Sequence, residues 1–238
     1  MKIGIMQPYF FPYIGYWQLI NYVDKYVILD DVNYIKRGWI NRNRILVNGA
    51  VRYFNVKINK ASQNKLIKDT YICGDDVGSQ IELLKYAYRQ APEYVTVMKL
   101  LEVCLQYNDL NLTNYLKRQI ELVNDYLGIH TPIVLSSHIE KNDKLKGQDR
   151  IIEICKKLRA TEYCNAIGGV ELYNESDFAK NGIELKFLKA HLVEYNQGSD
   201  YFVPALSIID VLMNNPKNAV KNYLNDFELV VNDIICKK

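Results

Sequence analysis

The chain has 238 residues, of which 49% are hydrophobic and 24% are charged, and its formal net charge is only +3. That charge is too small to indicate nucleic-acid binding, and no apolar run approaches the roughly 18 residues that a membrane-spanning helix needs. The composition is that of an ordinary globular protein, so we expect residues 1–238 to form a single domain without a membrane span.

The cysteines and histidines favour a cytoplasmic protein without a metal site. An odd number of cysteines without C-x-x-C spacing is typical of reduced, mostly buried thiols. The cysteines lie at positions 73, 104, 155, 164 and 236. The three histidines are too few and too dispersed to indicate a metal site.

The first third of the chain predicts strands around a helix, followed by a hairpin. The predicted segments are a strand at Lys2–Met6, a helix at Tyr16–Val23 and a strand at Lys25–Leu29. Further on, Asn48-Gly49 separates two β-like segments at 43–47 and 51–56. Because type I′ turns require a positive φ at both central residues, this pair predicts a β-hairpin.

The middle of the chain predicts helices. Apolar residues recur every three or four positions from Leu112 to Leu127, and Gly128 is a typical residue after a helix end. A second helix is predicted over Ser79–Gln90, which stops before Ala91-Pro92. We interpret residues of about 75–128 as a helical insertion.

After this insertion the alternation of strands and helices resumes. The predicted strands are Pro132–Ser136, Thr161–Cys164 and Ile183–Leu188, and the predicted helices are Gln148–Leu158 and Leu206–Asn214. Such alternation predicts an α/β fold with an open, mostly parallel sheet that carries the hairpin and the insertion.

A proline-rich aromatic loop follows the first predicted strand. It brings a strand end and a helix start close together, which is where open α/β sheets bind ligands and where phosphate or carboxylate is favoured. Gln7 can donate and accept hydrogen bonds, Tyr13 and Tyr16 offer hydroxyls that can position a reacting group, and Gly15 allows a ligand close to the backbone. A proline-braced turn that packs against the sheet is the competing interpretation.

A basic block leads into the predicted hairpin. Its cations, amides and indole are Lys36, Arg37, Trp39, Asn41, Arg42, Asn43 and Arg44. Guanidinium groups bind diphosphates or carboxylates bidentately, and an indole can stack on a base or a sugar. In a strand, Asn41 and Asn43 would share one face and the neighbouring arginines the other. A solvated basic loop is the competing interpretation.

A Gly-Gly turn follows the strand predicted at 161–164. Gly168 and Gly169, together with Asn165, can hold an anion or an oxyanion through backbone N–H groups. The spacing matches neither a P-loop nor a G-x-G-x-x-G fingerprint. A tight turn before a short helix therefore explains the glycines at least as well.

The sequence offers few candidates for acid–base chemistry. His191 is the histidine that we consider as an acid or base, and Asp30 is a further candidate base. Gln148, at the start of a predicted helix, can face the same cleft. Ser207 predicts a helix N-cap, with Asp210 in the first turn. No serine- or cysteine-nucleophile motif is present, which argues against triad chemistry.

Four segments together resemble the WbqC-like protein family. They are the Gln-Pro-x-Phe-Phe-Pro-Tyr-Ile-Gly-Tyr opening, the Lys-Arg-Gly-Trp-x-Asn-Arg-Asn-Arg block, the Asn-x-x-Gly-Gly-x-x-Leu-Tyr turn and the late Leu-Ser-Ile-Ile-Asp. The resemblance implies a bacterial protein of surface-polysaccharide gene clusters, notably those for the O-antigen of lipopolysaccharide. It also implies a proposed role in transferring glycine, or another acyl unit, to an amino sugar. It supplies no catalytic residues.

The opening segment also resembles, more remotely, the HxGH signature of the nucleotidylyltransferase superfamily. That likeness implies a Rossmann-like fold and a nucleotide site after the first strand. Tyr13 and Tyr16 stand where the signature has histidines, and neutral phenols cannot supply an imidazolium charge. The four cations of the basic block would supply the positive charge instead.

We therefore expect a cytoplasmic transferase that forms an amide on a nucleotide-linked amino sugar or another phosphorylated small molecule, with no nucleic-acid partner. Two alternatives stay open. One is adenylyl transfer with ATP and Mg²⁺ that activates a carboxylate, and the other is a non-catalytic scaffold that binds nucleotides or carbohydrates. The sequence predicts neither the acyl donor nor the oligomeric state.

Overall fold

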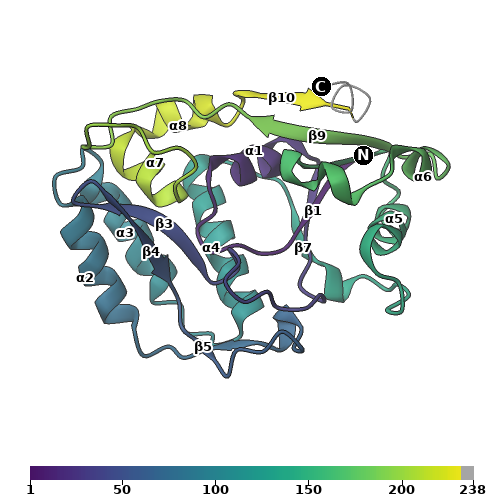
Figure 1. The fold of residues 1–238 in the computed structure, drawn as a ribbon, viewed down its shortest axis with the longest axis horizontal. Helices are drawn as coiled ribbons and strands as arrows, with labels where there is room; N and C mark the ends of the chain where they lie inside the picture. Colours follow the sequence, from purple (N-terminus) through teal and green to yellow (C-terminus); the bar gives the residue numbers. More distant parts are fainter. Residues whose placement is uncertain (232–238) are drawn as a thin grey trace.

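The computed structural model describes residues 1–231 and is built on a six-stranded sheet (Figure 1). The strand order is β10-β9-β8-β1-β2-β7, and every neighbouring pair is parallel except β10 with β9. The strands are β1 (Lys2–Met6), β2 (Lys25–Ile28), β7 (Ile133–Leu135), β8 (Glu162–Ala166), β9 (Glu184–Ala190) and β10 (Phe227–Val230). This arrangement confirms the predicted α/β fold with a mostly parallel, Rossmann-like sheet.

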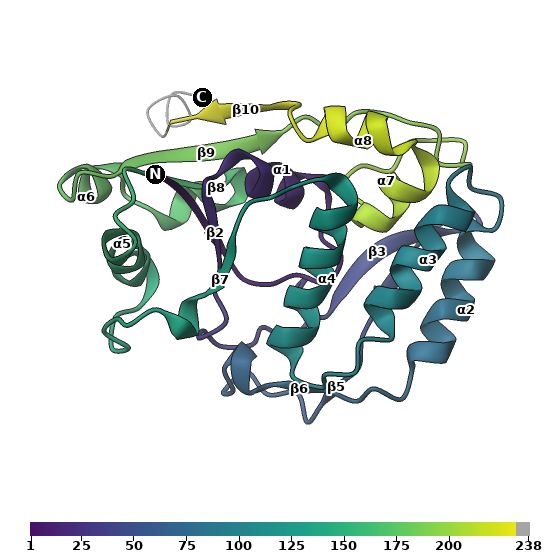
Figure 2. The same cartoon turned by 180° about the vertical axis from the view of Figure 1, so that it is seen from behind.

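Both faces of the sheet are covered, as the apolar sequences of its parallel strands require. Ile3 and Ile5 of β1 share a core with α5 and α6, whereas Tyr26 and Ile28 of β2 share a second core with α1. The bounds are α1 (Ile14–Tyr22), α5 (Gly147–Lys157) and α6 (Glu175–Ala179). Figures 1 and 2 show α5 and α6 on one side of the sheet and α2, α3 and α4 on the other.

Between β2 and β7 the chain leaves the sheet, and the elements of this segment contribute further residues to the second core. Its elements are β3 (Arg42–Val47), β4 (Ala50–Asn55), β5 (Ile58–Asn59), β6 (Tyr71–Ile72), α2 (Val77–Tyr88), α3 (Tyr94–Leu105) and α4 (Leu112–Leu127). The predicted helices near 79–90 and 112–127 are confirmed. We did not predict α3 separately, because Val95 and Val103 place apolar side chains on its exposed face and blur the helical period.

The hairpin and two helix ends follow directly from their sequences. Asn48 and Gly49 have φ angles of 51° and 72°, as a type I′ turn requires. Gly128 ends α4 in the left-handed conformation, with φ of 75°. Ser207 caps α7, where its Oγ accepts a hydrogen bond of 3.2 Å from the N–H of Ile209. These local predictions are confirmed.

The remaining elements are helices. They are α7 (Ile208–Asn214), α8 (Lys217–Tyr223) and three short 3₁₀ helices, η1 (Ile67–Asp69), η2 (Ser136–His138) and η3 (Ile167–Leu172). The sequence analysis did not predict α8 or β10. Across residues 1–231, every helix is too short or too polar to cross a bilayer.

The described cysteines are free thiols, as expected. Cys104, Cys155 and Cys164 are buried and Cys73 is exposed, which agrees with the expectation of mostly buried thiols. Cys73 follows the short strand β6 at the protein surface. Cys236 lies outside the described residues.

Candidate functional site

A cavity of about 560 Å³ opens at the carboxyl ends of β1 and β8. The helix after β1 covers one face of the sheet and the helix before β8 covers the other, so the direction of winding reverses between these two strands. Open α/β sheets bind ligands at such a reversal. The cavity is lined by Ile5, Met6, Gln7, Tyr9, Pro12, Tyr13, Leu29, Ile35, Trp39, Asn43, Asn165, Ala166, Gly168, Gly169, Leu172, Tyr173 and Ala205.

Within residues 1–231, the lining of this cavity contains rings and amides but no charged side chain. A charged group of a ligand that entered it would lose water without gaining a counterion, which costs several kcal/mol. Uncharged hydroxyls and amines would instead find hydrogen-bond partners and apolar ring faces. The cavity therefore fits an uncharged, hydrogen-bonding part of a ligand.

Asn43 and Ser207 hold the N-terminal loop in a strained shape. Phe11 is buried with φ of 41°, an uncommon conformation for a bulky residue. Its carbonyl accepts hydrogen bonds from Asn43 Nδ2 and Ser207 Oγ, both at 2.8 Å. Asn43 Nδ2 also lies 3.2 Å from the carbonyl oxygen of Phe10. Such strain persists only where the surroundings enforce it, and it clusters at functional sites. Asn43 thus acts on the cavity by positioning the loop.

Gly15 gives Tyr13 its place beside the cavity. A Cβ atom at residue 15 would lie 2.5 Å from a ring carbon of Tyr13 and 2.6 Å from its hydroxyl oxygen. Any other residue at this position would displace that ring. Tyr16, by contrast, is fully buried, and its hydroxyl donates to the carbonyl of Gln7 at 3.1 Å. Tyr13 therefore borders the cavity, whereas Tyr16 fixes the backbone beneath it.

The end of β8 contributes a fixed wall of phenols and one amide. Asn165 Nδ2 donates to the hydroxyls of Tyr163 at 2.8 Å and Tyr173 at 3.1 Å, and its Oδ1 accepts from the N–H of Ala166 at 2.7 Å. Most of the hydrogen-bonding capacity of Asn165 is therefore used within the protein. Gly169 packs against this amide, since a Cβ there would lie 3.1 Å from Asn165 Nδ2. This wall is organised before any ligand arrives.

The phenols around the cavity stay neutral at physiological pH. Burial raises the pKa of Tyr13 and of Tyr173, and burial together with these two neighbours raises the pKa of Tyr9. Burial also raises the pKa of Tyr16 above its usual range. Since the described residues give the lining no carboxylate, imidazole or amine, they place there no group that exchanges protons near neutral pH.

Three polar groups of the lining are available to a ligand. Within residues 1–231, the amide of Gln7 and the hydroxyls of Tyr9 and Tyr13 have no hydrogen-bond partner. Apolar side chains surround the opening, where Ile35, Trp39 and Leu172 are 48%, 40% and 68% exposed. A bound ligand would form hydrogen bonds with these polar groups and cover part of the exposed apolar side chains.

The basic block divides between the cavity and its surroundings. Trp39 and Asn43 line the cavity. Lys36 and Arg37 are exposed on the loop between Ile35 and Trp39, two residues of the lining. These two cations therefore lie near the opening without entering the cavity.

The other residues of the block serve the local structure. The Arg42 guanidinium lies 4.2 Å from the ring centroid of Tyr53 and donates to the carbonyls of Gly38 and Arg37. Arg44 Nη2 donates to the carbonyl of Ala205 at 3.2 Å. Asn41 likewise donates to the carbonyl of Val56 at 2.9 Å. None of the three lines the cavity.

Asp30, His191 and Gln148 also lie outside the lining of the cavity. Asp30 is buried and accepts hydrogen bonds from the N–H and Oγ of Ser137, at 3.0 and 2.7 Å. His191 Nδ1 lies 2.8 Å from Asp226 Oδ1 on the exposed surface. Gln148 Nε2 donates to Asp177 at 2.9 Å. Their positions therefore lend no support to direct roles in the cavity.

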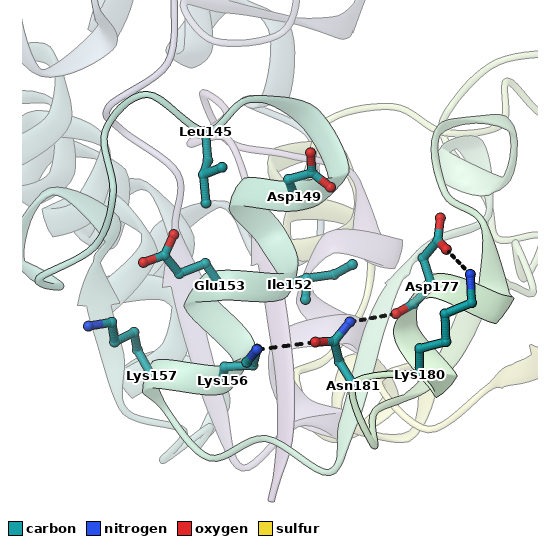
Figure 3. Close-up of a pocket in the computed structure, with 9 residues that line it drawn as sticks. All are labelled: Leu145, Asp149, Ile152, Glu153, Lys156, Lys157, Asp177, Lys180 and Asn181. Atoms are coloured by element: carbon teal, nitrogen blue, oxygen red, sulfur yellow. Dashed lines mark hydrogen bonds and ion pairs between the residues drawn. The ribbon is translucent and has the colours of Figure 1, made fainter.

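A groove of about 570 Å³, nearly the same size, lies between α5 and α6 (Figure 3). Charged side chains dominate its lining, and two of them form an ion pair. Lys180 pairs with Asp177 at 2.9 Å, and Lys156 Nζ donates to Asn181 Oδ1 at 3.2 Å. Asp177 and Lys180 are 38% and 71% exposed, so their ion pair is solvated and weak. We call this hollow the α5–α6 groove and do not consider it the functional site.

Comparison with known proteins supports one assignment. Residues 7–222 match the model of the WbqC-like protein family. The chain belongs to this family. It is also similar to the uncharacterized protein Rv1507c of Mycobacterium tuberculosis (strain ATCC 25618 / H37Rv), with 29% identity over 222 residues that cover 90% of this chain and 93% of that protein. No solved structure matches the chain.

Several cavity residues of this WbqC-like protein were not among our predicted site residues. Tyr9 and Tyr173 lie inside the opening segment and the Gly-Gly turn, so the two motifs themselves were the signal that could have identified them. Ala205 has φ of 53° and reaches the cavity from a distant loop. Nothing in the sequence around Ala205 indicates that position.

The cavity of this WbqC-like protein does not fit a Mg²⁺–ATP complex. Mg²⁺ prefers carboxylate and phosphate oxygens, yet no carboxylate from residues 1–231 lines the cavity. In the described part of the chain, His, Cys, Asp and Glu nowhere form a group of three or more that could hold a metal ion.

Proposed function

We propose that this WbqC-like protein is a cytoplasmic transferase that holds the sugar of a nucleotide-linked amino sugar in the cavity between β1 and β8. It would attach glycine or another acyl unit to the amino group during synthesis of a bacterial surface polysaccharide such as O-antigen. The uncharged lining of rings and amides is the observation that carries the proposal. The resemblance suggests the reaction, and the lining suggests which part of the substrate is held.

The available polar groups match the chemistry of a sugar. The amide of Gln7 and the hydroxyls of Tyr9 and Tyr13 can each donate and accept hydrogen bonds, as sugar hydroxyls and amino groups do. Trp39 offers an apolar surface at the opening for the C–H face of a sugar ring. A diphosphate in the same place would find no cation. The sugar is therefore the part of the substrate that we place inside.

The diphosphate would lie at the opening, near Lys36 and Arg37. Both side chains are exposed beside the lining residues Ile35 and Trp39. Exposed cations attract anions chiefly through long-range steering, which salt screens. We therefore expect their contribution to binding to weaken as the salt concentration rises. Arg42 and Arg44 have no part in this proposal, because backbone carbonyls already engage both guanidiniums.

Amide formation places limits on how the cavity can act. The amine nitrogen attacks the carbonyl carbon of an activated acyl donor, the C–N bond forms, and the bond to the leaving group breaks. Because no lining side chain titrates near neutral pH, the leaving group or water takes the amine proton. The cavity would contribute orientation, which can lower a barrier by about 7–11 kcal/mol at best. The N–H groups of Gly168 and Gly169 are the candidate oxyanion donors.

A non-catalytic binding protein is the second candidate function. Among residues 1–231, no side chain of the lining titrates near neutral pH, which favours this candidate, because binding needs no acid or base. It predicts saturable ligand binding without turnover. Adenylyl transfer from ATP ranks below both, since the cavity offers neither cations for the phosphates nor carboxylates for Mg²⁺.

Thermal shift and mass spectrometry together test the proposal. Uridine and deoxythymidine diphosphate amino sugars, the nucleoside diphosphates alone, ATP with Mg²⁺ and coenzyme A are the ligands to compare. A ligand at a hundred times its Kd should stabilise the protein by about 2.7 kcal/mol. We expect an amino-sugar nucleotide to do so and the diphosphate alone to do much less.

Incubation of that amino sugar with a glycyl thioester should then yield the N-glycyl product. Binding without product would favour the non-catalytic candidate. If no amino-sugar nucleotide stabilised the protein, the proposal would be wrong.

A further inference from the structure

We propose that a second, polar groove of this protein binds an oligosaccharide chain. This groove has a volume of about 340 Å³. It is lined by Leu46, Asn48, Gly49, Tyr86, Ala87, Tyr88, Arg89, Gln90, Ala91, Pro92, Asn196, Gln197, Gly198 and Asn214. We call it the amide groove. It lies outside the cavity, and the inference does not depend on the function proposed for that cavity.

Side-chain amides dominate the amide groove. Five come from the hairpin turn, the end of α2, the loop after β9 and the end of α7: Asn48, Gln90, Asn196, Gln197 and Asn214. Amides donate and accept hydrogen bonds, as the hydroxyl groups of sugars do. Intramolecular bonds use both ends of the Gln197 amide and one end of the amides of Asn48, Asn196 and Asn214. The amide of Gln90 has no partner within residues 1–231, so it and the free ends of the other three are the groups left for a ligand. In the described part of the chain, Arg89 is the one charged residue of the lining, and no carboxylate accompanies it. A nucleic acid would need many more cations, so a neutral or weakly acidic saccharide is the better fit.

An exposed ring in the amide groove offers a stacking surface. Tyr86 is 52% exposed, yet its hydroxyl accepts a hydrogen bond of 2.8 Å from Asn48 Nδ2. The Arg89 guanidinium lies 5.9 Å from the ring centroid. The ring is therefore held in place while much of its surface stays open to solvent. A held ring loses little conformational freedom when a sugar stacks on it.

A buried network stiffens the wall behind the amide groove. The carboxylate of Asp210 is fully buried and accepts hydrogen bonds from the hydroxyls of Tyr88 at 2.9 Å and Tyr195 at 2.8 Å. Gln197 makes two hydrogen bonds to the backbone of Val203, at 3.0 and 2.7 Å. Satisfied buried networks rigidify their surroundings. This network gives the Tyr195–Asp210 segment a structural role beside a binding surface.

The amide groove and the cavity share one strand. Asn43 of β3 lines the cavity, and Leu46 of the same strand lines the amide groove. Three residues of a strand span roughly 10 Å. The loop that carries Asn196 continues to Ala205, which lines the cavity. Asn43 and Leu46 point to opposite faces of β3, so this strand and this loop separate the amide groove from the cavity while joining their walls.

Binding of the complete protein to an array of bacterial surface glycans tests this inference. We expect at least one glycan to bind, and its affinity in solution to fall about tenfold or more in Tyr86→Ala and in Gln90→Ala. Tyr86→Phe keeps the ring and should retain most of the affinity. Tyr71→Ala, which changes a 50% exposed tyrosine on β6 outside the amide groove, is the matched control and should bind as the wild type does.

Three results would overturn the inference. They are an array without any bound glycan, full affinity in both Tyr86→Ala and Gln90→Ala, and loss of glycan binding in Gln7→Leu instead, which would place the glycan in the cavity. The thermal shift of Tyr86→Ala with amino-sugar nucleotides should equal that of the wild type. That measurement separates a failure of the amide groove from a failure of the proposed function.

Discussion

Two hollows of nearly equal size have opposite chemistry in this protein. The α5–α6 groove, of about 570 Å³, is lined mainly by charged side chains, among which Lys180 pairs with Asp177 and Lys156 binds Asn181. The cavity between β1 and β8, of about 560 Å³, has no charged side chain, and three of its polar groups lack a partner within residues 1–231. Volume therefore does not identify the functional site. The functional site is identified instead by polar groups that lie at the ends of buried strands and are available to a ligand.

Charges near the two hollows also differ in burial. At the end of β2, Asp31 is 7% exposed and lies 2.5 Å from Lys141, whose side chain is 2% exposed. In the α5–α6 groove, Asp177 and Lys180 are in contact with water. The ion pair at the end of β2 is thus buried, whereas the ion pair of the α5–α6 groove is solvated. The following predictions test this difference, from the largest expected effect to the smallest.

Asp31→Asn should destabilise the protein by about 3 kcal/mol, because Lys141 would remain buried without its partner. Burial opposes ionisation of Asp31, but hydrogen bonds from Lys141 and Ser136 outweigh it and lower the pKa. Stability from this group is therefore full above about pH 4, the value of an unfolded Asp, and is lost as the pH falls through the lower folded value. Urea unfolding between pH 2.5 and 7 should show a flatter acid limb in Asp31→Asn than in the wild type. An unchanged acid limb would contradict the assignment.

Asn43→Ala should cost about 2 kcal/mol of unfolding free energy, because the buried carbonyls of Phe10 and Phe11 lose a donor. The matched control is Asn181→Ala in the α5–α6 groove, where the lost partners are exposed and the cost should be below about 0.5 kcal/mol. Urea denaturation measures both. Equal losses of unfolding free energy in the two variants would contradict the difference in burial between the two hollows.

Gly15→Ala should weaken ligand binding through Tyr13, whose ring occupies the space of the new Cβ. We expect a cost of about 1–2 kcal/mol in stability or affinity, as for other overpacked sites. Gly78→Ala is the control, because no atom lies within 4 Å of its new Cβ. Circular-dichroism melting and ligand titration separate the two effects. If Gly15→Ala behaved like Gly78→Ala, the placement of Tyr13 would be wrong.

Gln7→Leu and Gln148→Leu should have opposite consequences. The side-chain amide of Gln7 has no partner within residues 1–231, so its loss should leave stability unchanged and weaken amino-sugar nucleotide binding about tenfold, or about 1.4 kcal/mol. Gln148 binds Asp177 and the backbone of Asn174, so its loss should cost about 1 kcal/mol of stability without changing affinity. Calorimetric titration and urea denaturation of both variants distinguish the roles. The reverse pattern would place the functional site at the α5–α6 groove.

Lys180→Ala should have no measurable effect on stability, ligand affinity or the pH dependence at physiological salt. Its partner Asp177 is solvated, and salt screens such pairs. A clear loss of ligand affinity in this variant, measured by calorimetry, would show that the α5–α6 groove takes part in binding.

Local chemistry made much of the fold predictable. The hairpin follows from Asn48-Gly49, the end of α4 from Gly128 and the start of α7 from Ser207, because each rule concerns neighbours in sequence. The short elements α8 and β10 were missed, since their formation depends on packing against distant parts of the chain.

The site was harder to predict because long-range contacts decide which polar groups are available. Asn43 has a side chain that could bind a ligand. Its Nδ2 group instead donates to the carbonyl of Phe11, 32 residues earlier in the chain. Arg42 and Arg44 likewise bind backbone carbonyls that sequence spacing does not reveal. Gln7 is the opposite case, where the expected side chain reaches the cavity and lacks a partner in the described residues.

The central claim is that the cavity holds the sugar and leaves the phosphates outside. Saturation-transfer difference NMR of the protein with a bound amino-sugar nucleotide tests it most directly, because the signal reports which ligand protons lie closest to the protein. The account predicts the strongest saturation on the sugar ring protons, and a loss of that pattern in Gln7→Leu. Strong saturation confined to the nucleobase, or a pattern unchanged in Gln7→Leu, would contradict it.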